Sequence, residues 1–132
     1  MVRLIALFLV VTFAFSALPE GYWSKQKKVL LAKDEFAIYK IGESLFYFRW
    51  TLWVNHGLVM HYHYDGHPIQ NILYKEYKRN AFKLKLHETT KIRYEQPYVR
   101  LEFKGMEQND SRAQFALYLY DPTTTLNLKE VK

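Results

Sequence analysis

The chain of 132 residues contains no cysteine, five glycines and four prolines. The absence of cysteine excludes a disulfide framework, a thiolate zinc site, a catalytic thiol and a lipid-modified cysteine near the N-terminus. The small share of glycine and proline is unlike collagenous or low-complexity sequence. Because 49% of the residues are hydrophobic and 24% are charged, the composition is also unlike that of a disordered chain. We therefore expect a folded protein whose stability comes from its hydrophobic core alone.

A mostly apolar, uncharged run lies close to the N-terminus. Arg3 precedes the stretch Leu4–Ala17, which ends in small residues. A positive start, an apolar segment and small residues in this order are typical of a secretory signal peptide, and the run is shorter than the ~20 residues of a membrane-spanning helix. We predict a cleaved signal peptide at 1–17 and a single domain at 18–132, exported to the periplasm or the extracellular space without a stable transmembrane anchor. An uncleaved N-terminal anchor is the alternative.

Aromatic content and the alternation of apolar and polar residues both predict β-strands. Twenty of the 23 aromatic residues follow residue 17, and aromatic residues favour strands. The alternating segments are 35–41, 44–54, 58–64, 81–86, 98–104 and 113–120, with weaker candidates at 29–32 and 126–131. Residues 67–80 fit both the helical and the strand period, and we expect a strand there that pairs with 81–86. Seven or eight short strands at this spacing predict an all-β, antiparallel β-sandwich, with a small β-barrel as the alternative.

The segments 44–54 and 58–64 are expected to form a hairpin. Asn55-His56-Gly57 fits a three-residue loop in which Gly57 adopts the left-handed conformation. The resulting pairs are Val54 with Leu58, Leu52 with Met60, Trp50 with Tyr62, Phe48 with Tyr64, and Arg49 with His63. This register gives the hairpin one fully apolar face, whereas a two-residue loop would mix the two faces, so the hydrophobic pattern favours the longer loop.

Four of the five histidines lie within twelve residues of one another. His61 and His63 would share one face of a strand, about 6 to 7 Å apart, which is close enough to bind one metal ion. Zinc or copper would suit imidazole ligands, so a metal site of His61, His63 and His67 is an alternative function. Two features oppose it. A type I′ turn at Asp65-Gly66 would direct His67 to the other face, and Asp65 would lie about 13 Å from His61 along an extended strand.

Aromatic and polar residues alternate with the apolar set of this hairpin. They are Tyr47, Arg49, Thr51 and Trp53 on one strand and His61, His63 and Asp65 on the other. Such side chains bind partners by ring stacking, cation–π contact and directional hydrogen bonds. We therefore predict that this face binds an envelope protein, a peptide or a glycan. Burial of the same face under Trp23 or a loop, with Tyr47 and Trp53 as core residues, is the alternative.

The net charge of +6 is spread along the chain, with a single basic cluster at 25–28. Spread positive charge is typical of solvated strand faces, and it predicts at most weak contact with an anionic surface. No RNA-binding aromatic motif is present, so we expect no nucleic-acid partner. The sequence also has no nucleophile elbow, phosphate-binding glycine loop or H-E-x-x-H helix. We expect a binding or structural module of the cell envelope that is not an enzyme and needs no cofactor.

Overall fold

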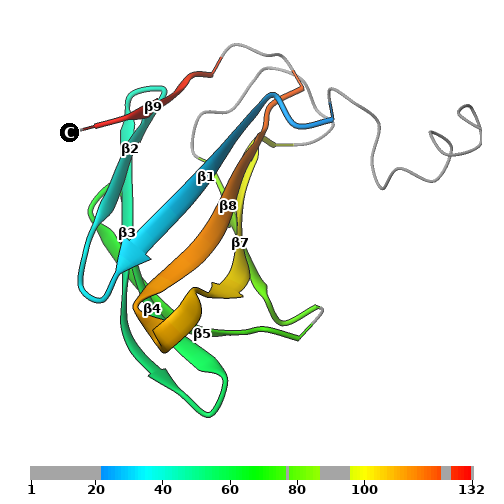
Figure 1. The fold of residues 1–132 in the computed structure, drawn as a ribbon. Helices are drawn as coiled ribbons and strands as arrows, with labels where there is room; N and C mark the ends of the chain where they lie inside the picture. The colour runs from blue at the N-terminus through cyan, green and yellow to red at the C-terminus, as the bar shows by residue number, and fades with distance from the viewer. Residues whose placement is uncertain (1–21, 77, 87–95, 123–125, 132) are drawn as a thin grey trace, which may run out of the picture.

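The computed structural model describes residues 22–76, 78–86, 96–122 and 126–131 (Figure 1). Its strands are β1 (Lys25–Ala32), β2 (Ala37–Ile41), β3 (Ser44–Val54), β4 (Gly57–Tyr64), β5 (His67–Tyr74), β6 (Ala81–Lys85), β7 (Tyr98–Met106), β8 (Arg112–Tyr120) and β9 (Leu128–Glu130), with one 3₁₀ turn at Gln108–Asp110. The predicted signal peptide, 1–17, lies outside the described residues. Within the described ranges, no helix is long and apolar enough to cross a membrane.

The strands form two antiparallel sheets (Figure 1). One sheet has the order β1-β8-β7-β6, and the other has the order β5-β4-β3-β2-β9. The predicted all-β antiparallel fold is confirmed, and the arrangement is consistent with the predicted sandwich. The barrel alternative is wrong, because the sheets are not closed on one another. The strand predicted within 67–80 exists as β5, but its partner is β4 and not the segment 81–86, which pairs with β7 instead.

The core lies between the two sheets and is rich in aromatic rings. Phe48 of β3 meets Phe115 of β8 edge-to-face at 5.7 Å between ring centroids, and Tyr62 of β4 stacks on Phe82 of β6 at 4.2 Å. Period-two alternation produces this arrangement, because every second residue of these strands points inward. The largest fully buried side chains come from both sheets: Tyr62, Phe46, Phe48, Phe103, Ile41, Leu58, Met60, Leu73, Leu101, Leu117, Leu119 and Val99.

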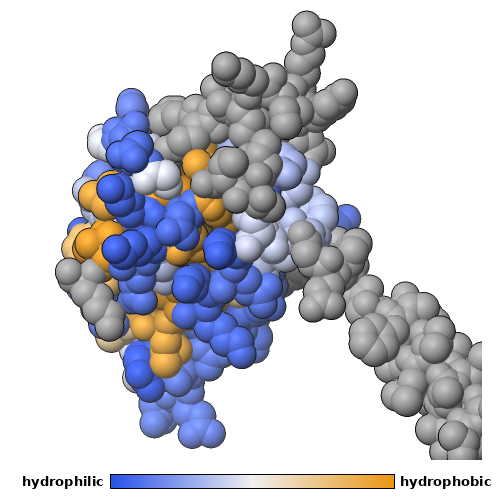
Figure 2. Space-filling view, turned by 90° about the horizontal axis from the view of Figure 1, so that it is seen from above, coloured by the Kyte–Doolittle hydropathy of each residue, from blue (hydrophilic) through white to orange (hydrophobic). Residues whose placement is uncertain are grey.

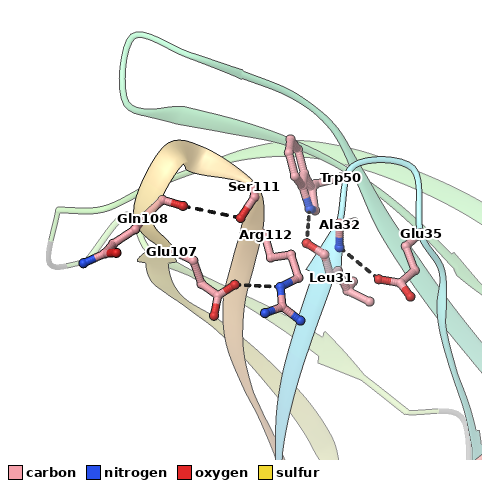
Figure 3. Close-up of polar contacts among 8 residues, drawn as sticks. All are labelled: Leu31, Ala32, Glu35, Trp50, Glu107, Gln108, Ser111 and Arg112. Atoms are coloured by element: carbon pink, nitrogen blue, oxygen red, sulfur yellow. Dashed lines mark hydrogen bonds and ion pairs between the residues drawn. The ribbon is translucent and has the colours of Figure 1, made fainter.

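Polar contacts fix the corner where β1 leads into β2 (Figure 3). The indole Nε1 of Trp50 donates a hydrogen bond of 2.8 Å to the carbonyl oxygen of Leu31. The backbone N–H of Ala32 donates to the Glu35 carboxylate at 2.9 Å, which closes the turn that follows β1. Buried polar groups are stable when they are paired in this way. The corner therefore joins the two sheets by a buried hydrogen bond as well as by packing.

The β3–β4 hairpin differs from the predicted one. Its turn has two residues, Asn55 and His56, both with positive φ (52° and 63°), and Val54 pairs with Gly57. Gly57 itself is not left-handed. A Cβ atom at Gly57 would instead lie 3.0 Å from the Cγ2 atom of Ile72. The three-residue loop is therefore wrong, and glycine is needed here because β5 packs closely against it.

A β-bulge lies between Trp50 and Leu52. With a two-residue turn and no bulge, apolar and polar residues would share each face of the hairpin, and the bulge keeps them on separate faces. The observed pairs are Leu52 with Val59 and Trp53 with Leu58 on the turn side of the bulge, and Trp50 with Met60, Arg49 with His61, Phe48 with Tyr62, Tyr47 with His63 and Phe46 with Tyr64 beyond it. The predicted register is thus wrong. For the residues of β3 up to Trp50, the observed partner in β4 lies two positions from the predicted one. A displacement of two residues leaves each of these side chains on its predicted face.

Candidate binding face on the five-stranded sheet

Five of the predicted face residues lie together on the outer side of β3 and β4. They are Tyr47, Arg49, Thr51, His61 and His63, which alternate with buried neighbours and are each half-buried. Because of the observed register, Arg49 lies opposite His61, and Tyr47 lies opposite His63. The predicted opposition of Arg49 and His63 is therefore wrong. We refer to these five residues as the histidine face.

The side chains of the histidine face contact one another. The rings of Tyr47 and His63 are stacked, with centroids 4.7 Å apart and planes only 8° from parallel. Nε2 of His61 and Oγ1 of Thr51 are 3.0 Å apart, which is hydrogen-bond distance. Two side-chain contacts between the neighbouring strands β3 and β4 thus hold both imidazoles in fixed orientations. An ordered surface of this kind loses little side-chain entropy when a partner binds.

Arg49 connects this face to the loop before β2. Its guanidinium carbon lies 5.0 Å from the centroid of the Phe36 ring, in a cation–π contact. The same side chain forms an ion pair of 3.8 Å with Asp34. The Phe36 ring, 46% exposed, also meets Tyr47 edge-on at 5.7 Å. The histidine face therefore continues into an exposed aromatic ring with a cation beside it.

Trp53 does not belong to the histidine face. The bulge reverses the facing of the residues after Thr51, so the Trp53 ring packs against the core and meets Phe103 at 5.6 Å. Its predicted place on the binding face is wrong for this reason, and the alternative that treats it as a core residue describes it better. The same reversal places Leu52 and Val54 on the outside, each 50% exposed.

Asp65 and His67 are also separate from the two imidazoles. Asp65 lies in an exposed two-residue turn with Gly66, and both residues have positive φ (51° and 83°), as a type I′ turn requires. His67 pairs with Tyr64, whose side chain is on the inner face, so His67 points away from the side that carries His61 and His63. In the described part of the chain, no three His, Asp or Glu side chains gather closely enough to hold a metal ion.

An aliphatic group beside the histidine face has no counterpart in the predicted site. Leu52, Val59 and Ile72 lie in one row across β3, β4 and β5, and Val54 follows Leu52. Ile72 is 48% exposed. We call these four residues the outer aliphatic group. The alternation of residues along β3 did not predict the outer aliphatic group. The group forms because the bulge turns Leu52 and Val54 outward and because β5 pairs with β4.

Aromatic rings and cations also gather on the outer side of the other sheet, which the sequence did not single out. Trp23 is there, in contact with Tyr118, and so it does not cover the histidine face as the alternative interpretation allowed. Comparison of the chain with protein-family models, with curated proteins and with solved structures gave no match. The function is therefore argued from the geometry of these two faces.

Proposed function

We propose that the protein is an exported, non-catalytic binding module of the cell envelope, and that the outer side of its five-stranded sheet binds a protein partner. One observation carries the proposal. The outer aliphatic group lies directly beside the histidine face on the same open side of the sheet, since Val59 and His61 are adjacent outward residues of β4. Along a strand, such residues are about 6 to 7 Å apart.

The combination suits a protein surface better than a small molecule or a simple glycan. Protein interfaces combine exposed aliphatic side chains with aromatic residues and arginine, and these residue types supply much of the binding energy. The outer aliphatic group offers three side chains that are about half exposed, Leu52, Val54 and Ile72. Arg49 and the stacked Tyr47–His63 pair offer the charged and aromatic contacts.

The contacts of the histidine face favour binding over catalysis. The Thr51 hydroxyl and the His61 imidazole resemble a nucleophile and its base, but such a pair also needs a third group that orients the imidazole. Among the described residues, the polar contact of His61 is with Thr51 alone. The pair also lies on the outer side of a sheet, where water would have free access to a reacting group.

The proposal is tested by photo-crosslinking in the cells that produce the protein. A benzoylphenylalanine at position 72 reports on the outer aliphatic group, and one at position 108, in the exposed 3₁₀ turn, is the matched control. We expect a discrete adduct from position 72 that is absent from position 108 and is lost when Arg49→Ala is added. Circular dichroism of each variant checks that the fold is kept.

Three results would contradict the proposal. The first is no adduct from position 72, the second is the same adduct from both positions, and the third is an adduct that survives Arg49→Ala undiminished. An adduct of twice the mass of the chain would identify the partner as a second copy of this protein.

A further inference from the structure

The outer side of the four-stranded sheet carries a cluster of five aromatic rings. The inward residues of β7 and β8 are buried apolar side chains such as Val99 and Leu119, so the alternate residues Tyr98, Tyr118 and Tyr120 point outward. Tyr22 and Trp23, just before β1, complete the cluster. We call these five residues the tyrosine platform.

The rings of the tyrosine platform support one another. Tyr98 and Tyr120 stack at 5.0 Å, Trp23 lies 4.9 Å from Tyr118, and Tyr22 lies 5.1 Å from Tyr120. The hydroxyl oxygens of Tyr22 and Tyr98 are 3.3 Å apart. The rings are thus held in place before any ligand binds, with hydroxyl groups at the surface.

A groove of about 430 Å³ continues from the platform along β1 and β8. Its lining includes Lys28 and Leu30 of β1, Gln114 and Tyr118 of β8, and Lys104 of β7. The small side chain of Ala116, which pairs with Lys28, lies among these longer ones and also lines the groove. Tyr118 belongs to both the groove and the platform, so the two form one continuous surface.

Cations dominate this side of the sheet. The outward cationic residues of the four strands are Lys28, Lys83, Lys85, Arg100, Lys104 and Arg112, whereas the one outward carboxylate on these strand faces is that of Glu102. Arg112 is paired with Glu107, just after β7, at 2.6 Å. Glu102 is already paired with Lys104 at 3.0 Å and with Arg100 at 3.8 Å. Lys83 lies over the Tyr98 ring at 4.1 Å from its centroid. The surface is therefore complementary to an anionic ligand.

We propose that the tyrosine platform and the adjoining groove bind an acidic polysaccharide. Lys28 and Lys104 pair with carboxylates of the polymer, the amide of Gln114 bonds to its hydroxyl groups, and the edges of Trp23 and Tyr118 pack against the sugar rings. The groove is a depression between longer side chains, which suits a polymer chain rather than a flat lipid surface.

The packing of the rings favours a sugar polymer over single-stranded nucleic acid. Nucleic-acid bases bind by stacking on free aromatic faces. In the tyrosine platform, the faces of Tyr98 and Tyr120 cover one another, and Lys83 lies over the Tyr98 ring. The hydroxyl groups of Tyr22 and Tyr98 lie in the exposed part of the platform, and they suit a ligand rich in hydroxyl groups.

The probe for this proposal is polygalacturonate, a linear polymer with one carboxylate per sugar. Its fully methyl-esterified form is the neutral control with the same backbone. Affinity electrophoresis at low ionic strength and at 0.5 M NaCl measures binding of the full chain to each polymer, with oligo(dT) and phosphatidylglycerol vesicles as competing anionic ligands. We expect binding to polygalacturonate that weakens with salt and is absent with the methyl ester. Equal binding to the ester, or tighter binding to DNA or vesicles, would overturn the proposal.

Two matched variants locate the site. Lys28→Ala/Lys104→Ala removes two exposed cations beside the groove, and Lys40→Ala/Lys129→Ala removes two exposed cations from the other sheet. We expect the first variant to weaken polygalacturonate binding about fivefold to tenfold and the second to weaken it less than about twofold. All four positions are exposed, so both variants should fold. Equal effects of the two variants would show that binding follows net charge alone and would overturn the assigned site.

Tryptophan fluorescence gives a second measurement, one that non-specific binding by net charge would not change. We expect polygalacturonate to change the tryptophan emission of the wild-type protein and to leave that of Trp23→Phe unchanged, because Trp50 and Trp53 lie in or against the core. An unchanged wild-type spectrum on saturation would overturn the role of the tyrosine platform. The histidine face takes no part in these measurements, so the protein-binding proposal stands or falls separately.

Discussion

The indole N–H of Trp50 and the carbonyl oxygen of Leu31 form a buried hydrogen bond of 2.8 Å between β3 of one sheet and β1 of the other. Replacing Trp50 by phenylalanine removes this bond and part of a ring that is 4% exposed. We expect Trp50→Phe to lower the free energy of unfolding by about 2 to 3 kcal/mol. Urea denaturation followed by far-ultraviolet circular dichroism measures the change.

Trp53→Phe is the matched control for this experiment. Trp53 is half-buried, and its contacts in the structure are with the rings of His56 and Phe103. Trp53→Phe should therefore lower the free energy of unfolding by less than Trp50→Phe does. An equal or larger loss for Trp53→Phe would contradict the importance of the bond between the sheets.

Tyr62 and Asn71 form a hydrogen bond between neighbouring strands, in which the phenol donates to Oδ1 at 2.8 Å. Burial raises the pKa of Tyr62 far above its usual value, so this side chain stays neutral and remains a donor in the folded protein. We expect Tyr62→Phe to destabilise the protein by about 1 kcal/mol. A double-mutant cycle with Asn71→Ala measures the coupling of the two residues, and additive losses would show that the bond contributes nothing.

The stability of the protein should fall at alkaline pH. Burial, and secondarily the negative charge of Glu130, raises the pKa of Tyr39 from 10.0 to about 12. Since the folded-state pKa is above the unfolded-state value, the contribution to stability is complete below pH 10 and is lost as the pH rises toward 12. Urea denaturation at a series of pH values measures this loss.

Tyr39→Phe is the control for the alkaline effect, because phenylalanine cannot ionise. We expect the free energy of unfolding of this variant to fall less steeply between pH 10 and pH 12 than that of the wild type. Tyr62 is present in both proteins, so its ionisation cancels in the comparison. Parallel losses in the two proteins would show that Tyr39 is not responsible.

Neighbouring positions of the β3–β4 turn should respond to substitution in opposite directions. His56 has a φ of 63°, which glycine adopts without steric cost, so His56→Gly should raise stability by about 0.5 to 1 kcal/mol. At Gly57, an added Cβ would lie 3.0 Å from Ile72 and 3.1 Å from Tyr74. Gly57→Ala should therefore lower the melting temperature measured by circular dichroism. The reverse order of the two melting temperatures would contradict the two-residue turn.

The sequence predicts the strands well because most of them are half-buried and alternate strictly. Val99, Leu101 and Phe103 of β7 and the corresponding residues of β8 are buried as expected, and these two strands pair with each other. Alternation fails where a strand contains an extra residue, since a bulge has no distinct composition. For that reason the facing of Leu52, Trp53 and Val54 was not predictable.

The candidate sites were predictable only in part. Tyr47, Arg49, Thr51, His61 and His63 share a face because each lies an even number of residues from its neighbour in the set, on the side of the bulge where the pattern holds. The tyrosine platform requires Tyr22 and Trp23 to meet Tyr98, Tyr118 and Tyr120, which are more than 70 residues further along the chain. A spatial relationship of this kind depends on strand order, and strand order is not encoded in alternation.

The extra residue in β3 reverses, within a single strand, which alternate side chains face outward. Before Thr51, odd-numbered side chains face water, and after it even-numbered ones do, so one strand supplies polar and aromatic groups to one half of its outer surface and aliphatic groups to the other. If β3 alternated regularly through Thr51 without a bulge, inside and outside would be exchanged at Leu52, Trp53 and Val54 together. The chemical character of the proposed protein-binding surface thus depends on the backbone geometry at one position as much as on which amino acids follow it.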